Sequence, residues 1–576
     1  MNPRRISLFQ GTVCLAALLA TGQAAAQAGS ERLAAAEARL QKVRAVYERL
    51  PTLQQQIVDG NRNAVHLADV WSRLAPSLNR PRIARPRGRR SEPSAGTLTP
   101  PFGILPVTDP SGDLDFSAFG GFTQSETHSA WCGSNVVVGF NDSGSFLETA
   151  SNGLGGFGFS GVAFSTDQGS TFRDVGPVNP GPDPATLLLG DPAVACSDPR
   201  TFYFSQIALA GSQEAPVAGI AFSKSADGGE DWGDPLTVVA KDGSTHILDK
   251  PWMAVDPANP RRIVITYTDF DLTGARPCLN DARTAIEFVS SVDNGAHWTL
   301  PFVVDQVCGF ANALQGSQVV LGATPQANAT GTPVRTQINF AWEAFSNYPI
   351  GPREIRTRSF NSYNRTFSPV VVADKIVGGG DSFLLQGGFR DFLSLSMAVD
   401  RSGGPTNGAL YVAWDDGRNK TVTDLLSQTG SYSYDDVLVR SSFDGGVNWG
   451  FAPTRVNSDV QPRFALGHDH YQPGIAVDRT AKVAVCWYDR RGDVENFAIS
   501  RYCGSSTDAG LTWTNTRVNV PAFAPVHGID QLLNPLYMGD YDGLTTDFLR
   551  LTPGFLGAFQ FMGSTANPNV VSTKFE

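Results

Sequence analysis

The chain has 576 residues, a formal net charge of −10 and only 17% charged residues. This acidic balance argues against a nucleic-acid partner, because proteins that bind nucleic acids present excess positive charge. The 59 glycines and 37 prolines favour turn-rich β structure over helices.

Residues 1–28 have the pattern of a cleaved signal peptide. Arg4 and Arg5 precede an apolar run, and Ala26 to Ala28 read Ala-Gln-Ala, a small-x-small cleavage site. No later stretch of the sequence is apolar over enough residues to span a bilayer. We therefore expect a protein that is secreted or periplasmic and has no membrane span.

Residues 29–78 are predicted to form a helical hairpin, and residues 79–102 a basic linker. Leu33, Leu40 and Tyr47 belong to an apolar stripe with alternating spacings of three and four. The stripe favours either docking of the hairpin on the main domain or self-association through these helices. The linker contains six arginines interleaved with prolines, which block regular structure.

Six cysteines follow the signal peptide, and an even number indicates disulfides in an exported chain. Cys486 and Cys503 flank a predicted strand hairpin, and Cys278 and Cys308 bracket one repeat. Each pair is therefore a candidate disulfide, with buried free thiols as the alternative. The sequence contains no Cys-x-x-Cys pair, so the cysteines do not predict a metal site.

A short motif recurs five times after residue 103. It reads Ser-x-Asp-x-Gly-x-x-Trp/Phe and lies in segments such as "FSTDQGSTF" and "SSFDGGVNW". Upstream of it an apolar strand, a polar turn and an alternating strand also recur, which gives seven starts at spacings of roughly 60–80 residues. The aspartates of the motif are Asp167, Asp227, Asp293, Asp444 and Asp508.

This period predicts an all-β fold, a β-propeller, because units of four strands repeated radially bury each sheet against its neighbours. We expect seven blades over residues 103–576, with six blades as the alternative. The last unit contains material for only about three strands. The segment 103–109 is therefore expected to add the missing strand and close the ring, which removes an exposed sheet edge.

The repeated aspartate is expected to be structural. An aspartate in a tight turn accepts hydrogen bonds from nearby backbone N–H groups, and glycine supplies the positive φ that such a turn requires. The aromatic residue at the end of the motif can pack beneath the turn. A row of calcium sites is the alternative, but one carboxylate per turn is too few for an ion that takes 6–8 oxygen ligands.

These motifs resemble the Asp-box, or bacterial neuraminidase (BNR), repeats of the sialidase superfamily. The segments "DKPWMAVDP", "VAWDDGR", "AVCWYDRRGD" and "GDYDGL" are similar to those of secreted bacterial sialidase-like proteins, and the resemblance covers most of residues 120–565. It implies a glycoside hydrolase-like propeller. The Arg-Ile-Pro motif that usually begins a sialidase domain is missing from the propeller, which argues against an authentic exo-α-sialidase.

The resemblance also implies types of site residue. Sialidases hold the substrate carboxylate with three arginines and use a tyrosine paired with glutamate as nucleophile and an aspartate as acid/base. Arg390, Arg418 and Arg490 are candidates for the arginine clamp, because guanidinium forks suit carboxylates. Tyr541 and Tyr471 are candidates for the nucleophile.

The connections that enter the innermost strands share one face of a propeller, opposite the Asp-motif turns, and ligands usually bind at that mouth of the channel. Four of the seven histidines lie in these connections. The alternative is that these polar residues hydrogen-bond the loops and line a water-filled channel. The candidate catalytic residues are His246, Asp249, Arg390, Asp391, His468, His470, Asp489, Arg490, Asp540 and Tyr541.

Three functions compete on this basis. The first is a glycan-active enzyme, a glycoside hydrolase or a polysaccharide lyase, that acts on carbohydrate or a cell-surface polymer without a cofactor or metal. The second is a non-catalytic propeller that binds glycan or protein at the cell surface. The third is a transition-metal site at His246, His468 and His470, since imidazole is a common ligand.

Overall fold

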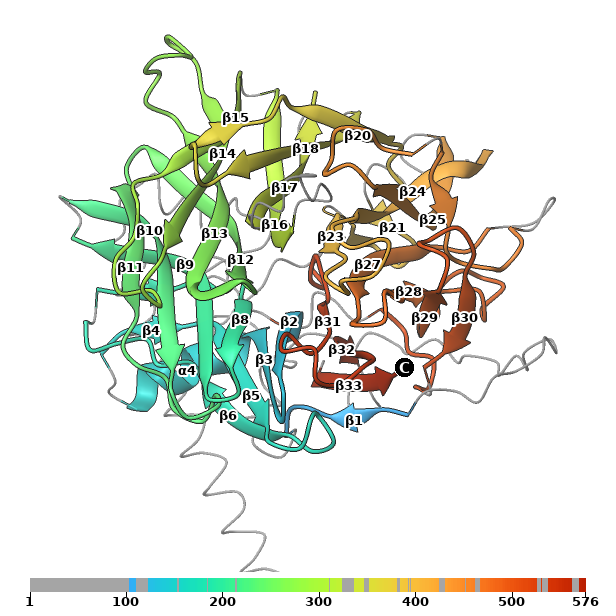
Figure 1. Cartoon of the computed structure of the whole chain (residues 1–576), viewed down its shortest axis with the longest axis horizontal. Coiled ribbons are helices and arrows are strands. Elements are labelled where there is room, and N and C mark those ends of the chain that lie inside the picture. The colour runs from blue at the N-terminus through green and yellow to red at the C-terminus, as the bar shows by residue number, and fades with distance from the viewer. Residues whose placement is uncertain are drawn as a thin grey trace, which may run out of the picture.

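The computed structural model describes residues 103–576 except for 110–122, 153–154, 184, 213–214, 310, 324–335, 347–351, 381–383, 392, 394, 424–429, 451, 462–466, 519, 526–529, 531–536 and 562–568. Within these residues the chain is an all-β propeller with seven blades around a central axis, as predicted (Figure 1). The predicted signal peptide, helical hairpin and linker lie outside the described residues.

Each blade consists mainly of four antiparallel strands that run from the axis outward. The first three blades contain β2 (Gln124–Cys132), β3 (Asn135–Asp142), β5 (Ser160–Ser165) and β6 (Arg173–Pro177); β8 (Ala193–Asp198), β9 (Thr201–Gly211), β10 (Pro216–Ser225) and β11 (Leu236–Asp242); and β12 (His246–Asp256), β13 (Asn259–Asp271), β14 (Arg283–Ser291) and β15 (Phe302–Cys308).

The fourth to sixth blades have the same order. They contain β16 (Ala313–Ala323), β17 (Thr336–Phe345), β18 (Arg353–Asn361) and β20 (Val371–Ile376), with β19 (Thr366–Phe367) beside β18; β23 (Ser396–Val399), β24 (Leu410–Thr423), β25 (Ser431–Ser442) and β26 (Thr454–Arg455); and β27 (His470–Val477), β28 (Val483–Asp489), β29 (Ser500–Ser506) and β30 (Thr514–Arg517).

Several short elements lie in the connections. The helix α4 and the strand β4 follow β3, the strand β7 extends the second sheet, and β21 pairs with β22 before the fifth blade. Their bounds are α4 (Ser143–Asn152), β4 (Phe157–Gly158), β7 (Leu187–Leu188), β21 (Leu384–Leu385) and β22 (Phe389–Arg390).

The seventh blade joins the two ends of the propeller. The C-terminal part of the chain supplies β31 (Leu544–Thr545), β32 (Phe555–Phe561) and β33 (Asn569–Phe575), and β1 (Leu105–Pro106) adds the outermost strand. β1 pairs antiparallel with β33, and Figure 1 shows the two strands side by side next to the C-terminus. The predicted closure by segment 103–109 is therefore confirmed, and it leaves the ring of blades without a break.

The core lies between the faces of neighbouring blades. Trp342, Trp414 and Trp487 occupy equivalent places in the second strands of three successive blades, and all three side chains are fully buried. An aromatic side chain buries a large apolar area, so one tryptophan per blade fills much of the gap between sheets. The indole N–H of Trp414 donates to Asp416 and that of Trp487 to Asp489, which satisfies the polar atom of each ring.

The five repeated aspartates form one type of turn, here called the Asp turn. In the first, the Asp167 carboxylate accepts hydrogen bonds from the Ser165 hydroxyl at 2.7 Å and from the Thr171 backbone N–H at 2.8 Å, while Gly169 has a φ of 78°. The other four turns repeat the serine bond at 2.7–2.8 Å and the positive-φ glycine. These bonds tie each turn to its own strand, which is the structural role that the motif predicts.

Three disulfides are formed. Cys486–Cys503 joins two directly paired residues of β28 and β29, and Cys278–Cys308 lies within the third blade. Both predicted pairs are confirmed. Cys132–Cys196 links the innermost strands of the first two blades. Among the described residues there is no helix that is long and apolar enough to cross a membrane.

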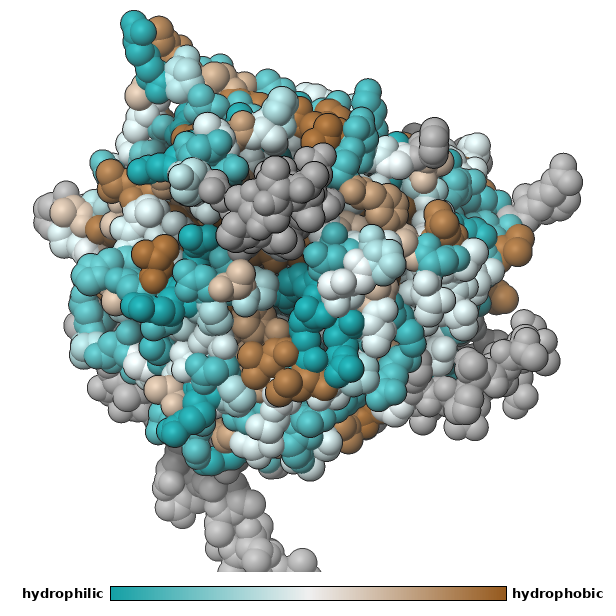
Figure 2. All heavy atoms as spheres, in the orientation of Figure 1, coloured by the Kyte–Doolittle hydropathy of each residue, from teal (hydrophilic) through white to brown (hydrophobic). Residues whose placement is uncertain are grey.

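Figure 2 shows one face of the propeller. Hydrophilic residues cover most of the described surface on this face, and hydrophobic residues form small separate groups. Isolated apolar side chains are normal on a protein surface and do not by themselves indicate a binding site.

Candidate functional site

A repeated backbone kink begins the innermost strands. Glu126, Asp191, Lys250 and Gln472 all have left-handed backbone conformations, with φ values of 50–55°, although none is glycine. Gly316 adopts the same conformation in the fourth blade. A left-handed non-glycine residue costs about 1–2 kcal/mol, and such strain is concentrated at functional sites.

The kinks interrupt the strand pairing. The register of β2 with β3, of β12 with β13 and of β27 with β28 shifts at these places, as in β-bulges. Bulges re-aim side chains relative to the sheet. The side chains of the kinked residues from the first three blades consequently meet, although they come from different sheets.

The Lys250 side chain joins these residues. Its Nζ lies 2.8 Å from Glu126 Oε1, 3.4 Å from Asp191 Oδ1 and 3.0 Å from Asp540 Oδ2. Asp540 in turn accepts a bidentate pair of hydrogen bonds from Arg390 Nη2, each 2.8 Å long. Through these contacts Lys250 and Arg390 join side chains of the first, second, third and seventh blades to β22. We call this set the axial cluster.

A second group of buried charges, here called the Arg353 group, adjoins the axial cluster. Arg353 Nη1 lies 3.0 Å from Glu343 Oε2, and the carboxylates of Asp391, Asp415 and Asp435 all raise the pKa of this guanidinium against the effect of burial. Asp415 also accepts a hydrogen bond from a backbone N–H of the kink in the sixth blade. Arg353 and Asp391 are buried but, at 8% exposed each, are the least completely buried members of this group.

Acidic groups outnumber basic groups here. Among the described residues the two groups and their direct neighbours contain nine buried carboxylates and four buried cations, each residue being at most 8% exposed. A buried excess of negative charge is costly, so some of these carboxyl groups retain protons. The acids are Glu126, Asp191, Asp249, Glu343, Asp391, Asp415, Asp435, Asp469 and Asp540, and the cations are Lys250, Arg353, Arg390 and Arg490.

The pKa values of Asp391 and Asp540 are driven in opposite directions. Burial and the neighbouring Asp415 carboxylate raise the pKa of Asp391 well above its ordinary value. Burial also acts to raise the pKa of Asp540, but the adjacent Arg390 and Lys250 outweigh it and hold that pKa below its ordinary value. The two carboxyl groups interact electrostatically. The Asp391 carboxyl group therefore holds its proton to a higher pH than the Asp540 carboxyl group does.

His470 lies in a third group in the sixth blade. It is fully buried, with Nε2 3.1 Å from Asp459 Oδ1 and Nδ1 2.8 Å from the Asp435 carbonyl oxygen. Burial lowers its pKa, but the Asp489 and Asp459 carboxylates outweigh this and raise the pKa to about 9. The ring is therefore an imidazolium at neutral pH. His468 lies 3.5 Å from the same Asp459.

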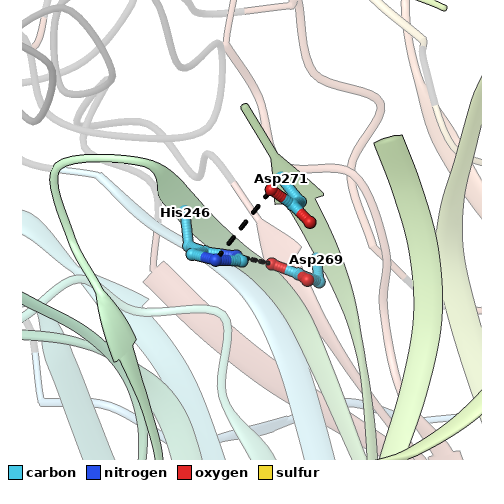
Figure 3. Close-up of side chains that lie close together, drawn as sticks. All are labelled: His246, Asp269 and Asp271. Carbon is cyan, nitrogen blue, oxygen red and sulfur yellow. Dashed lines mark hydrogen bonds and ion pairs between the residues drawn. The ribbon is translucent and has the colours of Figure 1, made fainter. Parts of the chain in front are cut away.

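His246 belongs to a fourth group, at the edge of the third blade (Figure 3). Its Nδ1 lies 2.9 Å from Asp269 and its Nε2 4.0 Å from Asp271. Lys241 and Arg283 also pair with Asp269, at 2.7 and 3.4 Å. Lys241 and Arg283 thus already balance the charge of these carboxylates. The three side chains therefore do not favour binding of a metal ion.

The three histidines of the metal hypothesis do not come together. Among the described residues the side chains close enough to share an ion are His246, Asp269 and Asp271. His468 and His470 instead lie beside Asp459 in another blade. A common site for these three histidines is therefore wrong.

The predicted catalytic residues lie in several separate parts of the structure. Arg390, Asp540 and Asp249 belong to or adjoin the axial cluster, and Asp391 belongs to the Arg353 group. His468, His470 and Asp489 form the third group, His246 lies in the fourth, and Tyr541 covers Lys250, with its ring centroid 5.1 Å from Nζ.

The predicted arginine clamp does not assemble as expected. Arg490 is fully buried, and its guanidinium lies over the rings of Phe389 and Tyr471. Arg418 pairs with Asp416 and Asp374. Arg390 and Arg490 are both completely buried, so in this conformation they position other groups.

Sequence reasoning missed four important members of the site: Glu126, Asp191, Arg353 and Asp435. Glu126 and Asp191 occupy the same place in "ETHSAW" and "DPAVAC" that Lys250 has in "KPWMAV". An alignment of the seven inner strands would therefore have found the first two. Arg353 and Asp435 lie on β18 and β25, whose sequences carry no comparable signal.

A channel runs along the axis between the blades. It has a volume of about 180 Å³ and is lined by residues of all seven innermost strands. A smaller hollow of about 30 Å³ is lined by residues that include Lys250, Trp252, Asp540 and Tyr541. The axial cluster therefore forms part of the wall of this hollow.

Solved structures are the known proteins to which this chain shows similarity. No protein-family model and no curated protein matches the chain. An α-L-arabinanase of Penicillium chrysogenum complexed with arabinobiose is 10% identical over 68% of this chain and 94% of its own, with a TM-score of 0.38.

Two further structures have different activities in their names. A PL25 ulvan lyase bound to a GlcA–Rha3S ligand is 11% identical over 82% of this chain and 94% of its own, with a TM-score of 0.43. The sialidase of Trypanosoma rangeli with the inhibitor DANA is 9% identical over 71% and 58%, with a TM-score of 0.37. Identities and TM-scores this low carry no argument about function.

Proposed function

We propose that this chain is a secreted carbohydrate-active enzyme of the Asp-box, sialidase-like type, which cleaves glycans by acid–base chemistry at the axial mouth of the propeller. The observation that carries the proposal is the pair Asp391 and Asp540, two buried carboxyl groups whose pKa values are driven apart. Glycosidic bond cleavage needs one carboxyl group that gives a proton and one that stays ionised.

Asp391 is the general acid in this proposal. Its raised pKa lets it hold a proton to a higher pH than an ordinary aspartate does, and at 8% exposed it is the most accessible of the nine buried acids. Asp540 stays ionised beside Arg390 and Lys250 and takes a proton from the water that attacks the sugar carbon, while the bond to the leaving oxygen breaks and Asp391 protonates that oxygen. His470 is already protonated near neutral pH, so it does not serve as the base.

Arg353 is the group that would contact an acidic sugar. It adjoins Asp391 and, at 8% exposed, is more accessible than Arg390 and Arg490, which are 0% exposed. A guanidinium suits the planar carboxylate of a sialic or uronic acid. Glycans that contain acidic sugars are therefore the substrate class we propose. A hydrolase would use the roles above, whereas a lyase would use the Asp540 carboxylate to take the C5 proton of a uronate and Asp391 to protonate the leaving oxygen.

The remaining organisation of the chain is part of the proposal. Residues 1–28 serve as a signal peptide, 29–78 as a helical hairpin, 79–102 as a linker and 103–576 as the catalytic propeller. Three disulfides support an oxidising compartment outside the cytoplasm.

The test is a screen of the purified full chain on sialosides and on polysaccharides rich in uronic acid. Release of reducing ends measures hydrolysis, and formation of an unsaturated uronate measures a lyase. Asp391→Asn should lower the rate by about 10²-fold or more, because general acid catalysis contributes roughly that factor. Asp305→Asn, a change of a carboxylate on the outer strand β15, should leave the rate unchanged.

Two outcomes would contradict the proposal. Full activity in Asp391→Asn would remove this residue as the acid. Binding of these glycans by the wild-type chain without any turnover would support the non-catalytic propeller instead.

A further inference from the structure

The axial channel has a second end, away from the axial cluster. There the channel wall includes Arg401, which lies two residues after the end of the innermost strand β23 of the fifth blade. The connection from β23 to β24 lies at the same end of this blade as the Asp turn of Asp444, because Leu410 is opposite both Val399 and Ser442. Arg401 is thus separated from the proposed active site by the length of an inner strand.

The Arg401 guanidinium has only weak charge compensation, from the Asp256 carboxylate. Among the described residues no carboxylate forms an ion pair with its guanidinium, and the nearby Asp256 is already held by Arg262 at 3.1 Å. Burial and the neighbouring Arg550 lower the pKa of Arg401 to about 10. The side chain therefore remains protonated but is poorly compensated, and an anion would relieve this.

The other charged group in the channel wall does not serve Arg401. Asp542 is buried and lies 3.2 Å from Arg501. The Arg401 guanidinium itself lies over the ring of Phe548, 5.3 Å from its centroid. Since the ring occupies one face of the planar group, the N–H donors along its edge remain to bind a ligand.

We propose that the channel is a binding site for a small monocarboxylate, with its oxygens on Arg401 and its apolar part along the channel. A carboxylate matches the donor fork of a guanidinium and forms a neutral pair with this partly buried cation. Val255, Ala398 and Val477, from three different blades, supply apolar wall. The volume of about 180 Å³ corresponds to about six water molecules, enough for a short-chain acid.

The test is isothermal titration calorimetry of the full chain with butyrate, acetate, sulfate and chloride. We expect butyrate to bind more tightly than acetate, because its longer chain buries more apolar surface. We expect sulfate and chloride to bind more weakly than either acid. Arg401→Gln should weaken butyrate binding by about tenfold or more, since a charge-assisted pair of hydrogen bonds is lost.

The matched control is Arg479→Gln, another arginine, whose guanidinium bonds the carbonyl oxygen of Leu551. This variant should bind butyrate like the wild type. Equal butyrate binding by the wild type and Arg401→Gln, or no butyrate binding by the wild type at millimolar concentration, would overturn the proposal. Tighter binding of sulfate than of butyrate would overturn the assignment to monocarboxylates.

If Arg401→Gln does not fold, Arg401→Lys keeps the positive charge but loses the planar fork. The proposal then expects weaker binding of butyrate with chloride binding retained, and unchanged butyrate binding would contradict it. Activity on glycans provides a separate readout, because Arg401 takes no part in the proposed reaction.

Discussion

Arg390 and Asp540 form a bidentate ion pair in which both side chains are completely buried, although 150 residues separate them in the chain. Arg390 belongs to a short strand before the fifth blade, and Asp540 precedes the inner strand of the seventh. The pair fixes Asp540 next to Lys250 in a region with more acids than bases. It also keeps Asp540 ionised, which the proposed chemistry requires.

The Asp turns are predicted to contribute to stability and not to ligand binding. Asp444→Ala removes the acceptor for the Ser442 hydroxyl and the Asn448 backbone N–H. The free energy of unfolding should fall by about 1–3 kcal/mol, the usual cost of leaving hydrogen-bond donors unsatisfied. Denaturant unfolding measures this change, with Asp231→Ala, which removes an exposed carboxylate, as a control. Unchanged stability together with lost activity would show that the turn is a site.

Asp391 is predicted to reduce stability at neutral pH. Its pKa in the folded protein is raised, so the folded state binds a proton more strongly than the unfolded state. Stability should therefore fall as the pH rises from about 4, the ordinary pKa of aspartate, toward the raised folded value. Asp391→Asn removes this ionisation, so it should be more stable than wild type at neutral pH. Unfolding measured across this pH range checks the sign, and a less stable variant at neutral pH would contradict it.

Lys250 is predicted to hold the axial cluster together. Lys250→Met leaves the Glu126, Asp191 and Asp540 carboxylates without this counter-charge, and loss of one member of a buried ion pair costs about 3–5 kcal/mol. Adding Glu126→Gln should recover part of the loss. Lys375→Met, on an exposed site of β20, is the control for the loss of a lysine. Thermal unfolding of the three variants measures the effect, and a wild-type midpoint for Lys250→Met would disprove it.

His470 is predicted to stabilise the fold below alkaline pH. Its pKa is raised to about 9 in the folded protein, so its stabilising contribution is fully present below the unfolded value of about 6.5. It is lost as the pH rises through about 9. Wild type should therefore lose stability over this range, whereas His470→Gln should not show this loss. His297→Gln, whose side chain is 88% exposed, is the control. Parallel curves for wild type and His470→Gln would contradict the assignment.

The local pattern of the sequence was sufficient for the architecture. Each copy of the motif carries its own serine, aspartate and positive-φ glycine, so the Asp turns form from residues within a few positions of one another. Seven repeated starts and a last unit short of one strand were enough to predict seven blades and closure by residues 103–109. Two of the disulfides followed in the same way, since each joins cysteines of a single repeat.

The site was decided only by the tertiary structure, because its contacts join different blades. Whether a buried aspartate is an acid or a carboxylate depends on its neighbours across the axis. Arg390 and Lys250 hold the pKa of Asp540 below its ordinary value, and burial and Asp415 raise the pKa of Asp391. The sequence placed charged residues at the entries to the inner strands, but it contained no information on which of them pair. Left-handed kinks at Glu126 and Lys250 bring side chains from separate sheets together. Such kinks cannot be predicted from the alternation of apolar and polar residues along a strand.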